Sequence, residues 1–317
     1  MKYIDLGLNV LWEDNSQGNI PNLPNKDQIK ELLDKCDWEP CRINDKDGYK
    51  IISKINNNFI FIPFPNIKMK YKIRKLIPQW QAGISSSTKQ VLQCLIDNMV
   101  EVKGGTFMMG ATSEQGNKVY SDEKPAHKVT LSDYYICKYE VTQEEWSAVM
   151  GNNPSYFKGV NLPVEQVSWN DCQEFIKKLN ELTGLKFRLP TEAEWKYAAR
   201  GGNKSRGYKY SGGNTIGDVA WYWDNSSKTT HQVGTKLPNE LGIYDMSGNV
   251  WEWCSDWYDS SYYSSSPSTN PIGPSTGSNR VLRGGSWSAD AQFCRVSTCG
   301  NYHPDSRNYI IGMRLAL

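Results

Sequence analysis

From about Val100 to the C-terminus, the chain consists of short apolar runs separated by glycine turns, which limits it to a fold with little regular structure. One helix start is well marked in this region, at Leu189-Pro190-Thr191-Glu192-Ala193-Glu194-Trp195. Thr191 can cap the helix while Glu194, three residues later, reaches back to the capping residue. This pattern predicts a domain of short strands and isolated helices.

The unusual part of the composition is its 12 Trp and 18 Tyr. Most of these rings are expected to fill the core of a domain that has few regular elements. Aromatic side chains in loops also supply rigid contact area at low entropic cost, which suits a binding surface. The formal net charge of +2 argues against a nucleic-acid partner, because such a protein needs a concentrated basic surface.

The first residues, Met1–Asp5, lack a basic stretch followed by an apolar run, so no secretory signal is predicted. No apolar run reaches the length of a membrane span. We therefore expect synthesis in the cytoplasm and mostly reduced thiols, with association with a phage particle or a cell surface left open. The 8 cysteines show no paired CxxC spacing, which makes a structural zinc site a poor expectation.

Residues 1–77 are predicted to form a small α+β unit. A capped helix is expected over residues 25–33, and strands are expected over Tyr49–Ile52 and Phe59–Ile62 with a turn at Asn56–Asn58 between them. The run from Lys68 to Lys75 alternates basic and apolar residues, which is typical of an edge strand with one charged face. An anionic partner is the alternative for this run.

Residues 78–98 are predicted to be a linker that contains a short helix. The run Ser85–Thr88 supplies the helix cap. Helical spacing then places an apolar stripe on one face of the helix, which could be part of a core or an oligomer contact. The residues of this stripe are Val91, Leu92, Leu95 and Ile96.

Eight motifs follow one another from residue 104 onward. They are Gly104–Gly110, Glu123–His127, Glu140–Thr142, Pro163–Trp169, Arg188–Trp195, Leu241–Trp253, Arg283–Trp287 and Gly312–Leu315.

In this order the motifs resemble the formylglycine-generating enzyme family, also called the sulfatase-modifying factor family. The resemblance covers about two-thirds of the chain. It implies that residues 99–317 adopt an α+β fold of the C-type-lectin-like kind.

The resemblance also implies a structural calcium ion at the Gly248-Asn249-Val250-Trp251-Glu252 loop. Calcium prefers hard oxygen ligands such as carboxylates and backbone carbonyls. The matching ligands would be the carboxylate of Glu252 and the carbonyls of Ser247, Gly248 and Val250. The alternative is that Glu252 forms a salt bridge or caps a turn.

Enzymes of this family hold copper(I) with two cysteines, because thiolates suit this soft ion. The family pattern places these cysteines three and eight residues after the Ser of Gly-Gly-Ser, which is Ser286 in this chain. The two positions are Ala289 and Cys294. Cys294 and Cys299 reproduce the spacing of five residues, but the pair is shifted along the chain. Copper and formylglycine-generating activity are therefore not expected.

The segment between Ser286 and Arg314 alternates scaffold-like residues with others that follow no structural pattern. It is similar to the variable region of diversity-generating retroelement proteins, in which adenines of Asn codons are randomised. Each intervening residue can arise from such a codon, and large rings among them would dominate binding. Ordinary loop packing is the alternative role. The intervening residues are Ser288, Ala289, Asp290, Phe293, Thr298, Cys299, Gly300, Asn301, Tyr302, His303, Ser306, Tyr309 and Ile310.

The sequence therefore predicts a ligand-binding protein whose C-terminal face, residues 288–310, contacts an unknown protein or carbohydrate. A lectin-like fold gathers these loop residues on one face, and exchangeable loops on a rigid scaffold are a common basis of binding diversity. The alternatives are a binding or structural relative that is not diversified, and an active formylglycine-generating oxidase.

Overall fold

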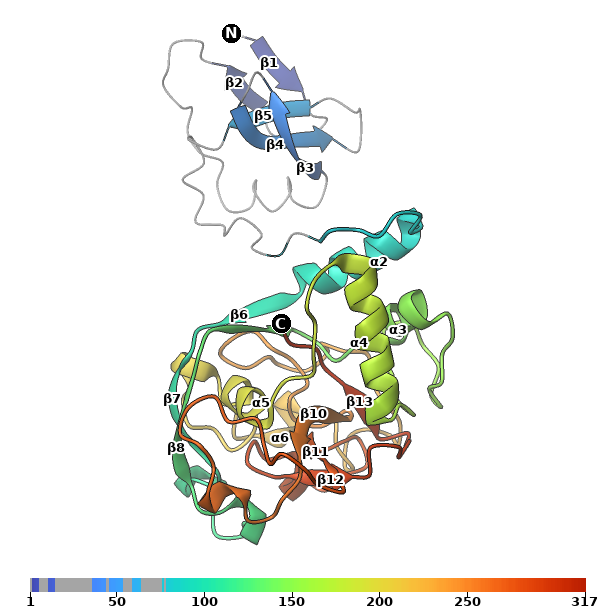
Figure 1. The fold of residues 1–317 in the computed structure, drawn as a ribbon. Coiled ribbons are helices and arrows are strands. Elements are labelled where there is room, and N and C mark those ends of the chain that lie inside the picture. The colour runs from blue at the N-terminus through green and yellow to red at the C-terminus, as the bar shows by residue number, and fades with distance from the viewer. Residues whose placement is uncertain are drawn as a thin grey trace. The chain divides into compact units, whose positions relative to one another are not determined.

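The computed structural model describes residues 2–5, 11–14, 36–43, 46–53, 59–63, 76 and 78–317. The chain divides into two compact units, Met1–Lys75 and Leu76–Leu317 (Figure 1). Each unit has its own set of strands.

The described part of the first unit consists of antiparallel strands. The predicted strands over 49–52 and 59–62 are confirmed, since they lie in β4 and β5 with Ile51 opposite Ile60. The helix expected over 25–33, the turn at 56–58 and the run 68–75 lie outside the described residues. The strands are β1 (Lys2–Asp5) paired with β2 (Leu11–Asp14), and β3 (Cys36–Ile43), β4 (Lys46–Ser53) and β5 (Phe59–Pro63) in one sheet.

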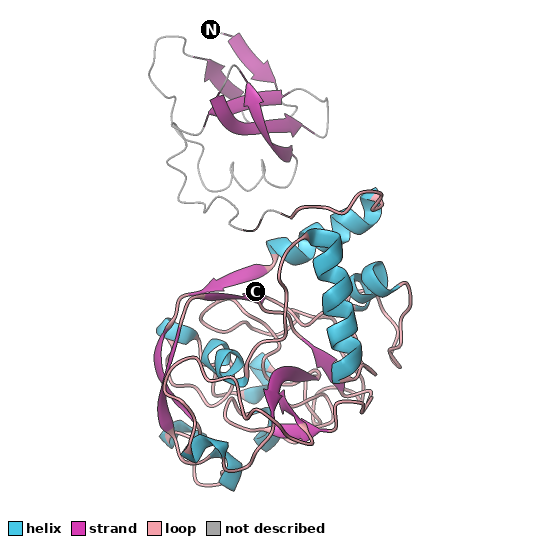
Figure 2. Ribbon diagram, viewed as in Figure 1, coloured by secondary structure: helices cyan, strands magenta, loops and turns pink. Residues whose placement is uncertain are grey.

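The second unit mixes short helices with short strands, and loops make up much of it (Figure 2). This agrees with the α+β class that the sequence predicts. Its helices are α2 (Ser86–Asp97), α3 (Gln143–Met150), α4 (Trp169–Thr183), α5 (Glu192–Ala199) and α6 (Ile216–Val219). Its strands are β6 (Met99–Val102), β7 (Gly105–Met109), β8 (His127–Leu131), β9 (Tyr134–Cys137), β10 (Trp251–Trp257), β11 (Arg280–Arg283), β12 (Gly300–Tyr302) and β13 (Ile311–Met313). Its 3-10 turns are η2 (Ser113–Gln115), η3 (Ser121–Glu123), η4 (Gly202–Lys204), η5 (Tyr262–Ser264) and η6 (Ala291–Cys294).

The strands of this unit form three sheets. Two of them are antiparallel pairs, β6 with β9 and β7 with β8. The third has the order β12-β11-β10-β13, in which β10 and β13 are parallel and the other pairs are antiparallel. This sheet holds both ends of the C-terminal face, residues 288–310. Strand β11 precedes these residues, β12 lies within them and β13 follows them.

Side-chain caps start the longer helices. The predicted box at α5 is confirmed, since the Glu194 amide donates to Thr191 Oγ1 at 3.2 Å and the Thr191 amide donates to Glu194 Oε2 at 2.9 Å. Ser85 caps α2 as expected, accepting from the Thr88 amide at 3.0 Å. Equivalent boxes at α3 and α4 use Thr142 and Ser168.

The apolar stripe of α2 is part of the core. Leu92, Leu95 and Ile96 are buried in the same cluster as residues of α3, α4 and the β10 sheet, whereas Val91 is half-buried. Trp146 of α3 and Phe175 of α4 stack there with ring centroids 4.9 Å apart. Helix α2 is therefore an integral part of the second unit.

Candidate functional site

The C-terminal face begins at a tight turn after β11. Gly284 and Gly285 have φ values of 100° and 79°, and a Cβ on Gly285 would lie 2.7 Å from the sulfur of Cys294. Trp287 then fixes both ends of the face. Its amide donates to the Asn249 carbonyl at 2.7 Å, and its indole Nε1 donates to the Tyr309 carbonyl at 3.2 Å.

The predicted contact residues differ in exposure. Four are exposed, namely Asp290, Tyr302, His303 and Tyr309. Eight are half-buried, namely Ser288, Ala289, Phe293, Cys299, Gly300, Asn301, Ser306 and Ile310.

Thr298 is the exception among the predicted contacts, because it is buried beneath the surface. Its hydroxyl donates to the carbonyl of Gln292 at 2.9 Å. Thr298 therefore closes a turn inside the segment and is not accessible to a ligand in this structure.

Two buried arginines fix the backbone of the segment. Arg283 pairs with Glu192, and its Nη1 donates to the carbonyls of Ser297 and Thr298. Arg295 pairs with Glu123, with Nη2 2.6 Å from Oε1. Burial raises the pKa of Glu123, but hydrogen bonds from Arg295 and Ser297 outweigh it and hold the pKa below its ordinary value.

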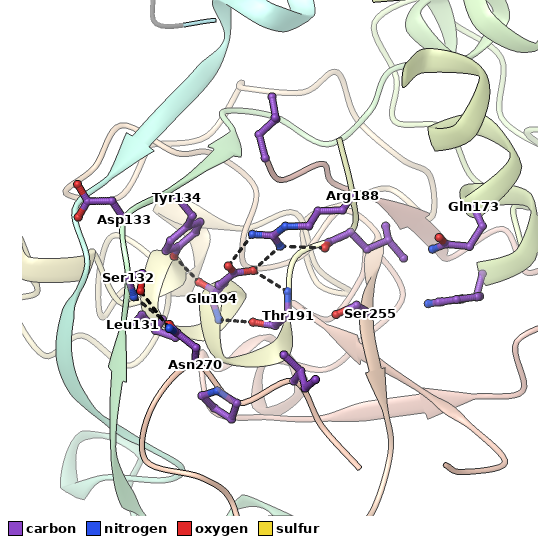
Figure 3. Close-up of a pocket in the computed structure, with 15 residues that line it drawn as sticks. Leu131, Ser132, Asp133, Tyr134, Gln173, Arg188, Thr191, Glu194, Ser255 and Asn270 are labelled. Atoms are coloured by element: carbon purple, nitrogen blue, oxygen red, sulfur yellow. Dashed lines mark hydrogen bonds and ion pairs between the residues drawn. The ribbon is translucent and has the colours of Figure 1, made fainter. Parts of the chain in front are cut away.

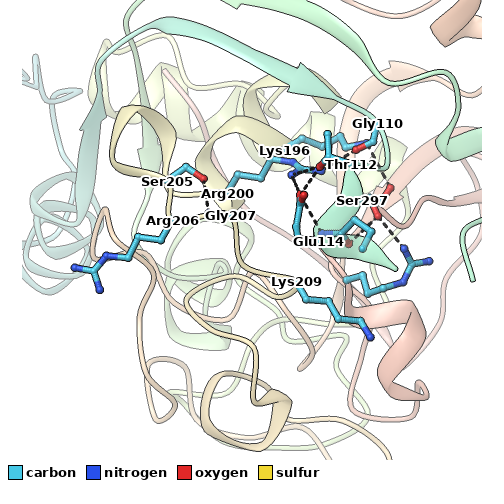
Figure 4. Close-up of polar contacts among 12 residues, drawn as sticks. Gly110, Thr112, Glu114, Lys196, Arg200, Ser205, Arg206, Gly207, Lys209 and Ser297 are labelled. Carbon is cyan, nitrogen blue, oxygen red and sulfur yellow. Dashed lines mark hydrogen bonds and ion pairs between the residues drawn. The ribbon is translucent and has the colours of Figure 1, made fainter. Parts of the chain in front are cut away.

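A second network fixes the loop that meets Ser297. Arg200, at the end of α5, donates to the Gly110 carbonyl at 2.7 Å and to Thr112 Oγ1 at 3.1 Å, and it pairs with Glu114. Figure 4 shows this network, with the side chains of Arg206 and Lys209 pointing away from it. In the same loop, Gln115 Oε1 lies 2.9 Å from the hydroxyl oxygen of Ser297.

Aromatic residues from distant loops contact the C-terminal face. Tyr309 lies 5.7 Å from Trp287 and 5.9 Å from Tyr156, measured between ring centroids. Phe293 stacks on Tyr120 at 6.0 Å. Sequence reasoning did not single out Tyr120 or Tyr156, because no local pattern links residues more than 150 positions apart; the abundance of aromatic residues was the only signal.

Ala289 and Cys294, the two positions that the sequence assigns to copper ligands, pack in one cluster. Ala289 packs against a small cluster formed by Cys294, Tyr210 and Val219. Burial raises the pKa of the Cys294 thiol to about 12. Cys299 instead packs against a different cluster, which contains Tyr263 and Val281. The assignment of Ala289 and Cys294 to the copper-ligand positions of the family stays a prediction.

The calcium expectation centres on Glu252, whose carboxylate is fully buried. Arg314 Nη2 lies 2.6 Å from Oε1, and the Trp195 indole donates to Oε2 at 2.6 Å. The Ser247 hydroxyl donates to the Cys294 carbonyl at 2.7 Å. A cation at this loop would therefore compete with Arg314 for Glu252, and calcium binding stays a prediction.

Two further carboxyl groups are buried close to Glu252. Burial raises the pKa of Glu140 well above its ordinary value, and Asp245 and Glu252 add to the effect. Burial raises the pKa of Asp245 to about 6. Within the part of the chain that the structure describes, no group of three or more His, Cys, Asp or Glu side chains is arranged to hold a metal ion.

A pocket of about 490 Å³ lies beside α5, and its lining includes no residue of the C-terminal face (Figure 3). Its polar groups are largely bonded to one another. Glu194 accepts from both terminal nitrogens of Arg188, at 2.6 and 2.7 Å. The Asn270 amide group exchanges two hydrogen bonds with Ser132. The pocket is therefore separate from the predicted ligand contacts.

Residues 85–317 match the family model described as a sulfatase-modifying factor enzyme 1-like domain. The chain belongs to this family. The resemblance that the sequence motifs indicate is thereby confirmed, together with the C-type-lectin-like fold that it implies.

Relatives within this family have different names. The chain is 36% identical over 286 residues to a protein named chaperone protein LppX of Paenibacillus barcinonensis, covering 74% of this chain and 94% of the relative. It is 36% identical over 298 residues to the formylglycine-generating enzyme of Thermomonospora curvata, covering 71% and 94%.

Among solved structures, Treponema denticola variable protein 1 is similar, with a TM-score of 0.63 and 36% identity. The match covers 69% of this chain and 94% of that protein. The expected likeness to a variable protein is therefore confirmed.

As for membrane association, none of the helices in the described ranges combines the length and apolar character that a bilayer span requires.

Proposed function

We propose that this chain is a ligand-binding protein whose exposed residues on the C-terminal face contact diverse ligands, and that these residues are diversified by a retroelement. The observation that supports it most is the contrast within one segment. Asp290, Tyr302 and His303 are exposed, whereas Arg283 and Arg295 fix the backbone from beneath through buried ion pairs. Exposed side chains can then change without loss of the scaffold.

Two further findings support this proposal over an oxidase. The first is the likeness to a protein named as a variable protein. The second is Ala289, which packs beside Cys294 and stands where the sequence motifs place the first copper-binding cysteine of the family. An oxidase of the family type would have to work with one thiol at this place, whereas linear copper(I) coordination in the family uses two.

The proposal is tested by displaying the full chain with the exposed and half-buried side chains of the face randomised, and selecting for binding to lysozyme. A control library randomises as many exposed positions elsewhere. Binders from the first library alone are the expected result. The face positions are Asp290, Phe293, Tyr302, His303, Ser306 and Tyr309, and the control positions are Met108, Lys128, Glu174, Lys177, Glu181 and Ile272.

Equal recovery of binders from both libraries, or no binder from either, would overturn the binding role of the face.

The diversification by a retroelement is tested by the DNA that flanks the gene. A reverse transcriptase and an adenine-rich near-copy of the last coding segment should lie beside it, and their absence would leave a binding protein of fixed sequence.

A further inference from the structure

The exposed aromatic side chains of the second unit gather around one segment. Among the residues that the structure describes there are five, with exposed fractions between 39% and 67%: Tyr120, Tyr156, Trp223, Tyr302 and Tyr309. Two belong to the C-terminal face. The other three come from separate loops, and each of them contacts that face directly. Large rings left in water in one area mark an interaction surface.

The three contacts are distributed along the face. Tyr120 stacks on Phe293 with the ring planes 13° apart. The Trp223 amide donates to the Ala289 carbonyl at 3.0 Å. Tyr156, the most exposed of the five, lies against Tyr309. The loop that follows α3 and the segment that precedes β13 thus meet at one end of the domain (Figure 1).

Buried carboxylates fix the backbone in two of the three loops that carry these rings. The Tyr120 amide donates to Glu123 at 2.9 Å, and Glu123 is the partner of Arg295. Next to Tyr156, the Phe157 amide donates to the buried carboxylate of Glu165 at 2.8 Å. Rings presented on a fixed backbone lose little conformational freedom when they bind, so more of the contact energy is retained as affinity.

We propose that Tyr120, Trp223 and Tyr156 are invariant anchors of a docking surface for folded proteins. They would supply affinity to every ligand, while the variable residues between them select which protein is bound. This inference rests on the proposed function, and it adds to it both the class of partner and three residues outside the C-terminal face.

The arrangement favours a protein over a carbohydrate or another small molecule. Sites for small molecules are concave and converge on a pocket. Instead, the rings of Tyr120 and Tyr156 contact the face at Phe293 and Tyr309, and the Trp223 backbone contacts it at Ala289. The 490 Å³ pocket includes none of these face residues. Exposed Tyr and Trp side chains that surround a patch are typical of the residues that dominate protein–protein affinity.

The test uses several unrelated lysozyme-binding clones from the library described above. Tyr120→Ala, Trp223→Ala and Tyr156→Ala are introduced into each clone, and the dissociation constant is measured. Each of the three alanine substitutions is expected to weaken every clone by about tenfold or more, whatever its variable sequence. Met108→Ala and Ile272→Ala remove exposed apolar side chains elsewhere and should change affinity by less than about twofold.

Thermal unfolding of each variant checks that the fold is retained. In addition, Tyr156→Phe, which keeps the ring, should restore the affinity for lysozyme that Tyr156→Ala loses. Clones that bind lysozyme equally well after all three alanine substitutions would overturn this inference and leave the proposed function intact. Recovery of binders only on amylose resin would overturn the assignment of a protein partner. Failure of the library itself would instead overturn the proposed function.

Discussion

At the scale of single residues, buried pairs of arginine and carboxylate organise the second unit. Arg314 is fully buried, and its ion pair with Glu252 joins β13 to β10. Glu252→Gln would remove the carboxylate that neutralises the buried charge of Arg314 and leave it only the carbonyls of Cys137 and Tyr244 and an uncharged side chain. We expect the free energy of unfolding to fall by about 3–5 kcal/mol, as is typical when one member of a buried pair is removed.

Urea unfolding followed by tryptophan fluorescence measures this change, because all but Trp12 and Trp38 of the 12 tryptophans lie in the second unit. Glu174→Gln is the matched control. Its carboxylate pairs with Lys178 on the exposed face of α4, and such a pair contributes roughly 0.5 kcal/mol or less. Equal stability of Glu252→Gln and wild type would show that Arg314 has another partner.

Single residues also show where sequence reasoning reaches its limit. The motifs on either side of Ala289 and Cys294 give both residues a register in the family pattern, but they do not show what the two side chains contact. The partners of Glu252 and Phe293 could not, since Arg314 and Tyr120 are brought to them only by the fold. Thr298 was expected on the face and lies beneath it, because η6 and Arg283 draw the backbone inward there.

At the scale of elements, the loop between α3 and α4 depends on Glu165. Its Oε1 accepts from the Phe157 amide, whereas its Oε2 is buried without a partner among the described groups. Burial raises the pKa of Glu165 from 4.5 to about 7, and the backbone amides of Phe157 and Tyr156 together with the charge of Lys158 offset only part of this. The folded protein therefore holds this proton more tightly than the unfolded chain between about pH 4.5 and pH 7.

Stability should consequently fall as the pH rises through this window, because the ionised carboxylate is disfavoured in the fold. Glu165→Gln keeps an acceptor for Phe157 but cannot ionise. Relative to wild type, it should gain stability between pH 5 and pH 8, by up to about 3 kcal/mol for a shift of this size. Urea unfolding at several pH values measures the difference.

Burial also raises the pKa values of Glu145 and Asp256 to about 7. Both groups are present in wild type and in Glu165→Gln, so the difference between the two proteins reports the titration of Glu165 alone. A difference between wild type and Glu165→Gln that does not change with pH would show that the Glu165 carboxyl group does not titrate in this range.

Elements were predictable where the signal is local. The cap at α5 follows from four residues in sequence, and α3 and α4 begin with the same kind of box. The strands of the C-terminal sheet have only three to seven residues, and β12 and β13 are fixed by pairing with β11 and β10 rather than by their own propensity. Such strands require the tertiary fold.

At the scale of the whole molecule, the described hydrophobic clusters of the second unit draw on residues from Leu76 onward. Leu92, Leu95 and Ile96 of α2 are among the most deeply buried. The sequence predicted the family domain from residue 99, with α2 in a linker before it. The family match starts at residue 85 and so includes this helix.

A protein of residues 76–317 should therefore unfold cooperatively at the same urea concentration as the second unit of the full chain. A protein of residues 99–317 lacks the three buried side chains of Leu92, Leu95 and Ile96. Because each such loss typically costs about 2–5 kcal/mol, residues 99–317 should not form a stable fold. Circular dichroism and urea unfolding distinguish the two proteins. Equal stability would mean that α2 packs on a domain that is already complete, and that the cluster beneath it closes without Leu92 and Leu95.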